Sequence, residues 1–141
     1  MFSTTPFDAS PADALNAVRS FSGQILVDLD ETLYLQNSTE DFIDCASPRI
    51  VARLVTKVLD IIKPWRMTGG HATRDVWRLA FIRILFPWTG LIWHRRVRIY
   101  GQQLLNQGLH QSLTSANQNV RIVTVGFVPV VKPLIAALGY N

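Results

Sequence analysis

A chain of 141 residues is long enough for one domain with a buried core and short for two. Apolar residues make up 48% of the chain and charged residues 17%, a composition that excludes a disordered tail, a linker or a fibrous protein. The formal net charge is +4, but the bases alternate with tryptophan and aliphatic residues, which argues against nucleic acid as a partner.

The charges are distributed unevenly along the chain. Residues 1–48 contain eight acids and one base, residues 49–98 contain eleven bases and two acids, and the remaining residues contain two bases. The net charges of these segments are therefore −7, +9 and +2, which indicates different roles for them.

The cysteine content and the N-terminus bear on the compartment. Cys45 is the single cysteine, so it cannot form an internal disulfide, and no Cys/His cluster has the spacing of zinc ligands. Residues 1–20 contain acids and prolines instead of a basic start and an apolar stretch, so they do not resemble a secretory signal. These features predict a cytoplasmic protein in which Cys45 is a small buried apolar residue, with a pKa raised by the acids before it.

The N-terminal part is expected to hold one strand between two helices. Residues 1–20 are expected to be a leader that docks on the body of the protein, with a short helix over 10–18 that begins with a serine cap and Pro11. The apolar run 23–28 follows a glycine and predicts a buried strand of the parallel type, with its C-terminal end at a site. The acids that follow Ser38 favour the start of a second helix there.

The middle of the chain is expected to be helical. Apolar residues recur at helical spacing over 50–62, 73–86 and 91–106, which predicts three amphipathic helices. Pro64 ends the first of them, and Thr73 is expected to cap the second. Arginines and a proline interrupt the long hydrophobic stretch in this region, so it is not a good transmembrane helix.

The C-terminal part is expected to contain a second strand and a last helix. The β-branched run 120–125 is ended by Gly126 and predicts another buried strand. A helix is expected over 130–138, with Pro129 and Pro133 at positions where backbone N–H groups are free in any case.

The strongest chemical signal directly follows the first predicted strand. The segment Val27-Asp28-Leu29-Asp30-Glu31-Thr32-Leu33 places two carboxylates, separated by one residue, where the chain leaves extended geometry, so both can face one pocket. One carboxylate can attack phosphorus while the other transfers a proton, and the pair attracts a hard cation such as Mg²⁺. An acidic turn whose aspartate caps a neighbouring N–H produces the same pattern.

Two segments resemble motifs of one family. The residues Asp28-Leu29-Asp30-Glu31-Thr32-Leu33 resemble the first motif, Asp-x-Asp-x-Thr, of the haloacid dehalogenase-like (HAD) phosphohydrolases. The residues Ile122-Val123-Thr124-Val125-Gly126-Phe127 resemble their second motif, a hydrophobic strand that ends in Ser or Thr and is often followed by a Gly-Phe pair. The residues between them resemble the helical cap of the phosphoserine-phosphatase-like branch.

This resemblance spans most of residues 23–139 and implies an α/β fold. Residues 21–48 and 118–141 would form part of a HAD-like Rossmannoid core, an incomplete set of parallel strands. Residues 49–117 would form a helical cap inserted after the first strand.

The resemblance also implies roles for five residues. Asp28 would be the nucleophile, and Asp30 would protonate the leaving group and then activate water, while both would bind Mg²⁺. Thr124 and Gly126 would bind the phosphate, together with Thr32, which would also brace the loop. The implied reaction is the hydrolysis of a phosphorylated small molecule or a lipid phosphate through an aspartyl-phosphate intermediate.

The sequence departs from the family after its second motif. The third motif of the family supplies a lysine that neutralises the aspartyl phosphate, and the fourth supplies acids that complete the Mg²⁺ site. Lys132 lies eight residues after Thr124 in the last predicted helix, where a surface position is expected, and no Asp or Glu follows Asp75. Two strands also make too little sheet for independent stability.

These departures lead to two expectations. One is an N-terminal fragment, a truncated reading frame, or a subunit that a complementing C-terminal segment completes. The other is a noncatalytic HAD remnant that acts as an interaction module.

The basic middle of the chain also contains the four tryptophans, which lie beside arginines within residues 63–98. Indoles and cations together suit a membrane interface, so this segment is expected to contact a membrane surface peripherally. The resemblance implies a membrane prenyltransferase-type partner as well, because some HAD-like domains of similar appearance act beside such enzymes. A cap packed on the core, with its arginines in a phosphate pocket or in solvent, also fits the pattern, and both interpretations stay open.

Overall fold

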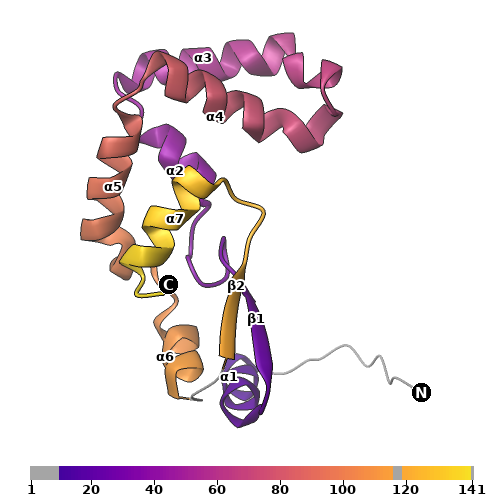
Figure 1. Ribbon diagram of the computed structural model, residues 1–141, viewed down its shortest axis with the longest axis vertical. Coiled ribbons are helices and arrows are strands. Elements are labelled where there is room, and N and C mark those ends of the chain that lie inside the picture. The colour runs from indigo at the N-terminus through magenta and orange to yellow at the C-terminus, as the bar shows by residue number, and fades with distance from the viewer. Residues whose placement is uncertain (1–9, 116–118, 141) are drawn as a thin grey trace.

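The computed structural model describes residues 10–115 and 119–140, and it shows a mixed α/β protein that is mostly helical (Figure 1). In chain order the elements are α1 (Pro11–Ser20), β1 (Gln24–Asp28), α2 (Ser38–Asp44), α3 (Arg49–Ile62), the 3₁₀ turns η1 (Pro64–Met67) and η2 (Gly70–Thr73), α4 (Arg74–Leu85), α5 (Thr89–Tyr100), the 3₁₀ turn η3 (Gly101–Leu104), α6 (Gln107–Ser115), β2 (Asn119–Val123) and α7 (Val128–Ala137).

β1 and β2 form a two-stranded parallel sheet in which Asp28 is in register with Val123. Both strands therefore end at the same edge, and the chain runs from that edge into α2 and α7. Val27 on one face of the sheet belongs to the core, whereas Leu26 on the other face is 65% exposed. The sheet is thus covered on one side only among the described residues. The expectation of two buried strands is therefore wrong, because no described element packs on the second face.

The core lies mainly between α2, α5 and α7, which contact one another in pairs. The fully buried Trp93 of α5 is at its centre, where its ring packs edge-on against Phe42 of α2 and its indole N–H donates to the carbonyl oxygen of Val130 at 2.9 Å. At the other end of the molecule α1 packs on α6, and Arg19 Nε donates to Ser112 Oγ at 3.2 Å. This contact confirms that the expected N-terminal helix docks on the body, while residues 1–9 of the expected leader lie outside the described residues.

Local sequence signals correctly placed several element ends. Ser10 caps α1 with its hydroxyl, which accepts from the N–H of Asp13, and Pro11 occupies the first turn. α3 ends at Ile62, and its cap residue Lys63 has a left-handed conformation directly before Pro64.

Two expected helix details are wrong. Thr73 stands at the start of α4 but does not cap it, because its hydroxyl donates to the carbonyl oxygen of Gly70 at 3.1 Å. α7 begins at Val128, so Pro133 is its sixth residue and lies beyond the four positions whose N–H groups are free. That proline therefore removes a hydrogen bond of the helix.

The expected helix over 91–106 is also wrong in its second half, because α5 ends at Tyr100. After η3 the chain pairs with the loop that follows β1: the N–H of Leu35 donates to Leu104, and that of Asn106 donates to Leu33, both at 2.8 Å. This pairing between distant segments replaces helical hydrogen bonds. α6, which follows, was not expected.

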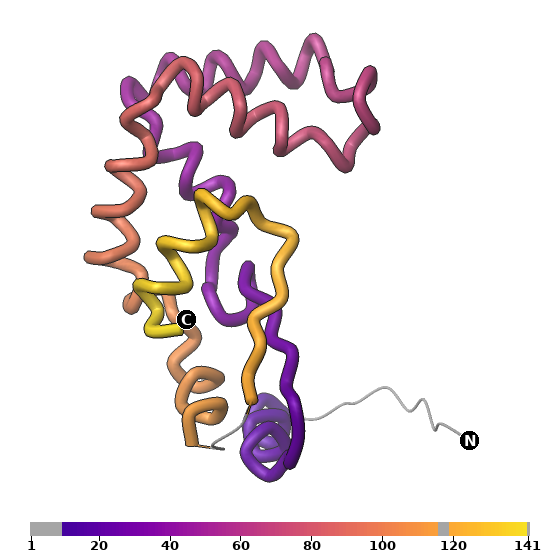
Figure 2. The backbone as a smooth tube through the Cα atoms, viewed as in Figure 1, coloured from indigo at the N-terminus to yellow at the C-terminus, as the bar shows by residue number. Residues whose placement is uncertain are grey.

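α3 and α4 run side by side as a hairpin that projects from the rest of the molecule, whereas α5 follows the body and packs on α7 (Figures 1 and 2). Arg78 of α4, 8% exposed, joins the hairpin to α2 through Glu40. No single helix of the described residues combines the length and apolar character that crossing a bilayer requires. Residues 70–85 and 89–104 meet that test only as a pair, with a bend of 107° between them.

Candidate functional site

The loop after β1 turns sharply at the first aspartate. The N–H of Leu33 donates to the carbonyl oxygen of Asp28 at 3.3 Å, and the N–H of Tyr34 donates to that of Leu29 at 2.8 Å. Both bonds join residues five apart, so the chain reverses its direction within this short loop. Glu31 within this turn has a φ of 60°, in the left-handed region. The chain therefore leaves extended geometry where the sequence predicted it.

The two carboxylates of this loop have different surroundings. Asp28 is exposed, and its Oδ2 lies 3.5 Å from Thr32 Oγ1, a long hydrogen bond. Asp30 is half-buried, and its Oδ1 accepts the backbone N–H of Ser38 at 2.7 Å, where α2 begins. The second oxygen of Asp30 is left for other partners.

β2 brings Thr124 and Gly126 to the same edge. β2 ends at Val123, two residues earlier than expected, because Thr124 Oγ1 accepts the backbone N–H of Gly126 at 2.9 Å and turns the chain. A Cβ at Gly126 would lie 3.8 Å from Asp30 Oδ2, so the backbone of this turn approaches the aspartate closely. The fold thus gathers Asp28, Asp30, Thr124 and Gly126 at the carboxyl ends of the two strands.

Two residues that support this loop were not among the site residues predicted from the sequence. Asn106 Nδ2 donates to the carbonyl oxygen of Thr32 at 3.2 Å, while its Oδ1 accepts the N–H of Leu109 at 3.1 Å and caps α6. Ser38 supplies the N–H that holds Asp30. An asparagine just before a helix is a cap signal that could have identified Asn106, but its contact with the loop depends on tertiary structure.

The oxygen donors at this edge suit magnesium in part. Among the residues that the structure describes, no group of three His, Cys, Asp or Glu side chains is close enough to hold a metal ion. Mg²⁺ is commonly bound through one or two carboxylates together with waters and substrate phosphate, not by a full protein cage. Asp28 and Asp30 fit that smaller ligand set, with hard oxygens only.

An ionic cluster fixes the loop to the helices behind it. The Tyr34 hydroxyl donates to Asp41 Oδ2 of α2, and Arg96 of α5 reaches Asp41 Oδ1 at 3.2 Å. Burial raises the pKa of Tyr34 well above its ordinary value, and the hydrogen bond and charge of Asp41 add to this. Cys45 beside them is buried, as predicted, and its pKa is raised chiefly by burial.

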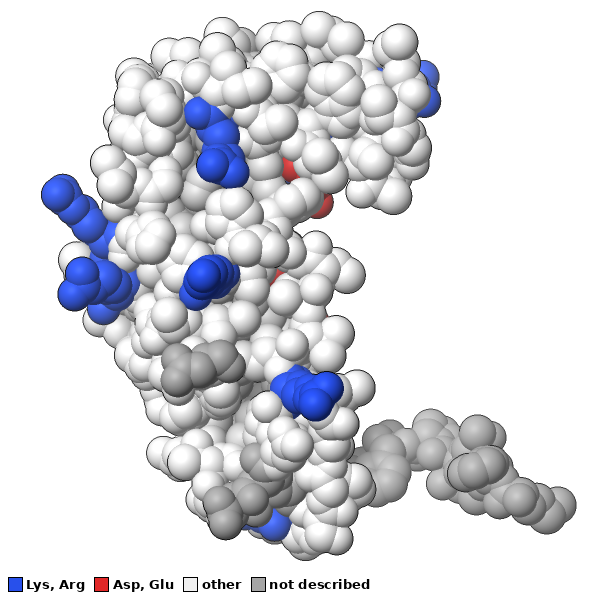
Figure 3. Space-filling model, viewed as in Figure 1, with Lys and Arg blue, Asp and Glu red and all other residues white. Residues whose placement is uncertain are grey.

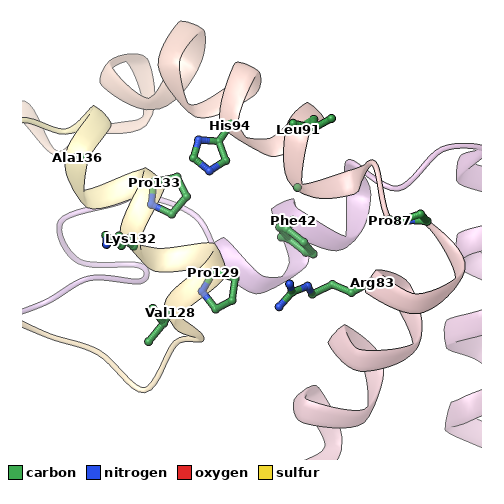
Figure 4. A pocket seen from close by; sticks show the side chains of 11 residues that line it. Phe42, Arg83, Pro87, Leu91, His94, Val128, Pro129, Lys132, Pro133 and Ala136 are labelled. Carbon is green, nitrogen blue, oxygen red and sulfur yellow. The ribbon is translucent and has the colours of Figure 1, made fainter.

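Two hollows lie along α7, near this edge. One of about 680 Å³ opens between α5 and α7, with Phe42 in its wall and the basic side chains of Arg83, His94 and Lys132 around it (Figure 4). A second, of about 630 Å³, is lined by Thr124 and by the exposed Lys132. Neither Asp28 nor Asp30 lines them.

No family model, no curated protein and no solved structure matches this chain.

Proposed function

We propose that this chain carries the phosphoryl-transfer edge of a HAD-like, Mg²⁺-dependent phosphohydrolase. In this proposal β1 and β2 belong to a Rossmannoid core, and the α3–α4 hairpin belongs to its helical cap. The supporting observation is the meeting of Asp28, Asp30, Thr124 and Gly126 at the carboxyl ends of paired parallel strands. Ligands of open α/β sheets bind at that edge.

In the first step an Asp28 carboxylate oxygen attacks the phosphorus of a phosphorylated small molecule or a lipid phosphate. A P–O bond to Asp28 forms, the bond to the leaving oxygen breaks, and that oxygen takes a proton from Asp30. Asp30 Oδ1 is occupied by the N–H of Ser38, so Oδ2, which faces Gly126, is the oxygen that carries the proton. Thr124 Oγ1 already accepts the N–H of Gly126, and its own hydroxyl hydrogen is available to the phosphoryl group.

In the second step water attacks the aspartyl phosphate. Asp30 takes a proton from the water, and the bond between phosphorus and the Asp28 oxygen breaks. Asp28 is thereby released as a carboxylate, and inorganic phosphate is the product. Asp28 and Asp30 would hold Mg²⁺, whose charge offsets that of the phosphoryl oxygens. Thr32, held by Asn106, keeps the loop in place throughout.

A second function, a noncatalytic interaction module, is supported by the small ligand set. The described residues offer only two clustered carboxylates for the metal. Lys132 is exposed, as expected for a surface lysine and not for one that neutralises an aspartyl phosphate. In the phosphohydrolase proposal waters and the substrate phosphate fill the remaining Mg²⁺ positions, and a complementing segment with the family's lysine and further acids would raise turnover above that of this chain.

Hydrolysis of p-nitrophenyl phosphate with and without Mg²⁺ tests the proposal. We expect Mg²⁺-dependent turnover that Asp28→Asn lowers by about a thousandfold or more, because the nucleophile is lost. Incubation with acetyl phosphate, followed by mass spectrometry of the intact chain, should show one added phosphoryl group, absent in Asp28→Asn.

Glu31→Gln is the matched control, because Glu31 is an exposed acid of the same loop. It should keep wild-type turnover and phosphorylation. Equal turnover in Asp28→Asn and wild type would disprove the role of Asp28, and a wild-type chain with neither turnover nor phosphorylation would favour the interaction module.

A further inference from the structure

The apolar face of α3 is turned away from the protein. The buried residues of this helix are Ala52, Thr56 and Leu59, which lie on one face at the spacing of helical turns. Its large aliphatic residues lie mostly on another face, where Ile50 is 84% exposed and Ile61 79% exposed. An amphipathic helix normally buries its apolar face, so α3 presents a surface that needs a partner.

This apolar face continues onto α4. A groove of about 350 Å³ between the two helices is lined by apolar side chains, including Leu54, Val58 and Ile62 of α3 and Phe81 and Leu85 of α4. Leu54 and Ile62 are themselves well exposed. We use the term outer surface for the exposed aliphatic residues of α3 and this groove.

Basic residues without acidic partners border the outer surface. Lys57 is exposed on α3 next to the apolar face, and Lys63 and Arg66 lie at the tip of the hairpin, beside the exposed Met67. No ion pair joins these three bases to an acid among the described residues. Figure 3 shows basic side chains at the hairpin tip and farther along the molecule.

The hairpin is strongly cationic as a whole. Residues 49–85 contain eight bases and two acids, a net charge of +6. Both acids are already paired, Asp60 with Arg74 at 2.9 Å and Asp75 with Arg78 at 3.3 Å. The partner of this surface must therefore accept aliphatic side chains and supply negative charge.

We propose that the outer surface docks on an anionic lipid bilayer, with α3 lying in the plane of the membrane. The hairpin projects from the body, so a flat bilayer can reach it without contacting the sheet (Figure 1). An interfacial helix buries its apolar face in the boundary between headgroups and acyl chains, while bases at its edge meet anionic headgroups. The proposed contact is centred on α3 and the hairpin tip, residues 49–67, and it overlaps the segment 63–98 expected from the tryptophans at the tip and at Phe81 and Leu85.

Sedimentation with vesicles tests this inference. Wild-type protein should pellet with vesicles of equal parts phosphatidylcholine and phosphatidylglycerol, and much less with phosphatidylcholine alone or in high salt. A triple variant should bind the anionic vesicles at least about tenfold more weakly than wild type, since it loses the aliphatic contact. Its substitutions are Ile50→Gln, Leu54→Gln and Ile61→Gln. Its circular dichroism should match wild type, because all three side chains are exposed.

The matched control replaces three exposed aliphatic residues outside the outer surface and should bind as wild type: Leu26→Gln, Val123→Gln, Ile99→Gln. A second variant, Lys57→Glu with Lys63→Glu, should lose binding to anionic vesicles whether or not the triple variant folds.

The proposal would be overturned if the wild-type protein stayed in the supernatant, or if a folded triple variant bound vesicles as wild type does. It would also be overturned if the wild type self-associated through this surface, the triple variant did not, and neither protein bound vesicles. Asp28→Asn should pellet as wild type, so the outcome is independent of the proposed phosphohydrolase activity.

Discussion

Gly126 occupies a position in which a side chain has no room. A Cβ there would lie 2.4 Å from Val131 Cγ2 and 3.0 Å from Thr124 Oγ1. The turn after β2 can therefore pack this closely against Val131 only because the residue is glycine. The sequence motif marked Gly126 as a phosphate-binding residue, and the structure adds a packing reason for it.

Gly126→Ala is expected to destabilise the protein by about 1 to 3 kcal/mol, because the added methyl group must displace Val131 or the turn. Urea denaturation followed by tryptophan fluorescence measures this loss. The control is Gly90→Ala in α5, where a Cβ meets nothing within 4 Å and a helical alanine is preferred by up to about 1 kcal/mol. Equal stability of Gly126→Ala and wild type would contradict the close packing.

At the scale of elements, Tyr34 connects the loop after β1 to two helices. Its hydroxyl donates to Asp41 of α2, which also pairs with Arg96 of α5. Tyr34 is 2% exposed, so its charged form is strongly disfavoured in the folded protein, and its pKa is raised.

This raised pKa predicts a loss of stability in alkali. A tyrosine of the unfolded chain loses its proton near about pH 10, whereas folded Tyr34 keeps it. The stabilisation is therefore fully present below pH 10 or so and falls by about 1.4 kcal/mol per pH unit above it, until the folded protein also titrates. Tyr34→Phe should remove the share of this loss that Tyr34 causes, while it lowers stability at neutral pH by about 1 to 2 kcal/mol. A smaller alkaline loss should remain, because burial also raises the pKa values of Cys45 and Tyr140.

Urea unfolding at a series of pH values from neutral to strongly alkaline measures the effect. Tyr100→Phe serves as the control, because Tyr100 is 50% exposed and its removal should leave the alkaline loss unchanged. If Tyr34→Phe loses stability in alkali as steeply as wild type, another group causes the dependence.

The elements also show where sequence patterns stop being informative. α1 and α3 could be predicted because a serine cap and a proline act within one turn. The end of α5 could not, because the competing partner of residues 104–106 is a loop seventy residues earlier in the chain. α6 contains only two large apolar residues, Leu109 and Leu113, and it lies against α1, which its own sequence does not indicate.

At the scale of the whole molecule, the sheet is small and open. Leu26 and Val123 are 65% and 51% exposed on one face, and among the described residues neither strand pairs with a third. Helices provide most of the core, so the stability of the protein depends on their packing more than on this face. Exposed aliphatic strand residues favour association between molecules.

Leu26→Thr with Val123→Thr is therefore expected to change the free energy of unfolding by no more than about 0.5 kcal/mol. The same variant should associate less at high concentration, as measured by sedimentation velocity. A large loss of stability would show that another part of the protein covers this face in solution.

Local features could be predicted from the sequence alone: the two apolar strands, the helix ends near prolines, and two aspartates where the first strand ends. These depend on residues within a few positions of one another, so periodicity and turn chemistry suffice to predict them.

Only the tertiary structure decided which distant segments meet. It brought Gly126 to Asp30, placed Asn106 against Thr32, and turned the apolar face of α3 outward. Amphipathic spacing shows that a helix has an apolar face, but what covers that face depends on contacts between residues far apart in the chain.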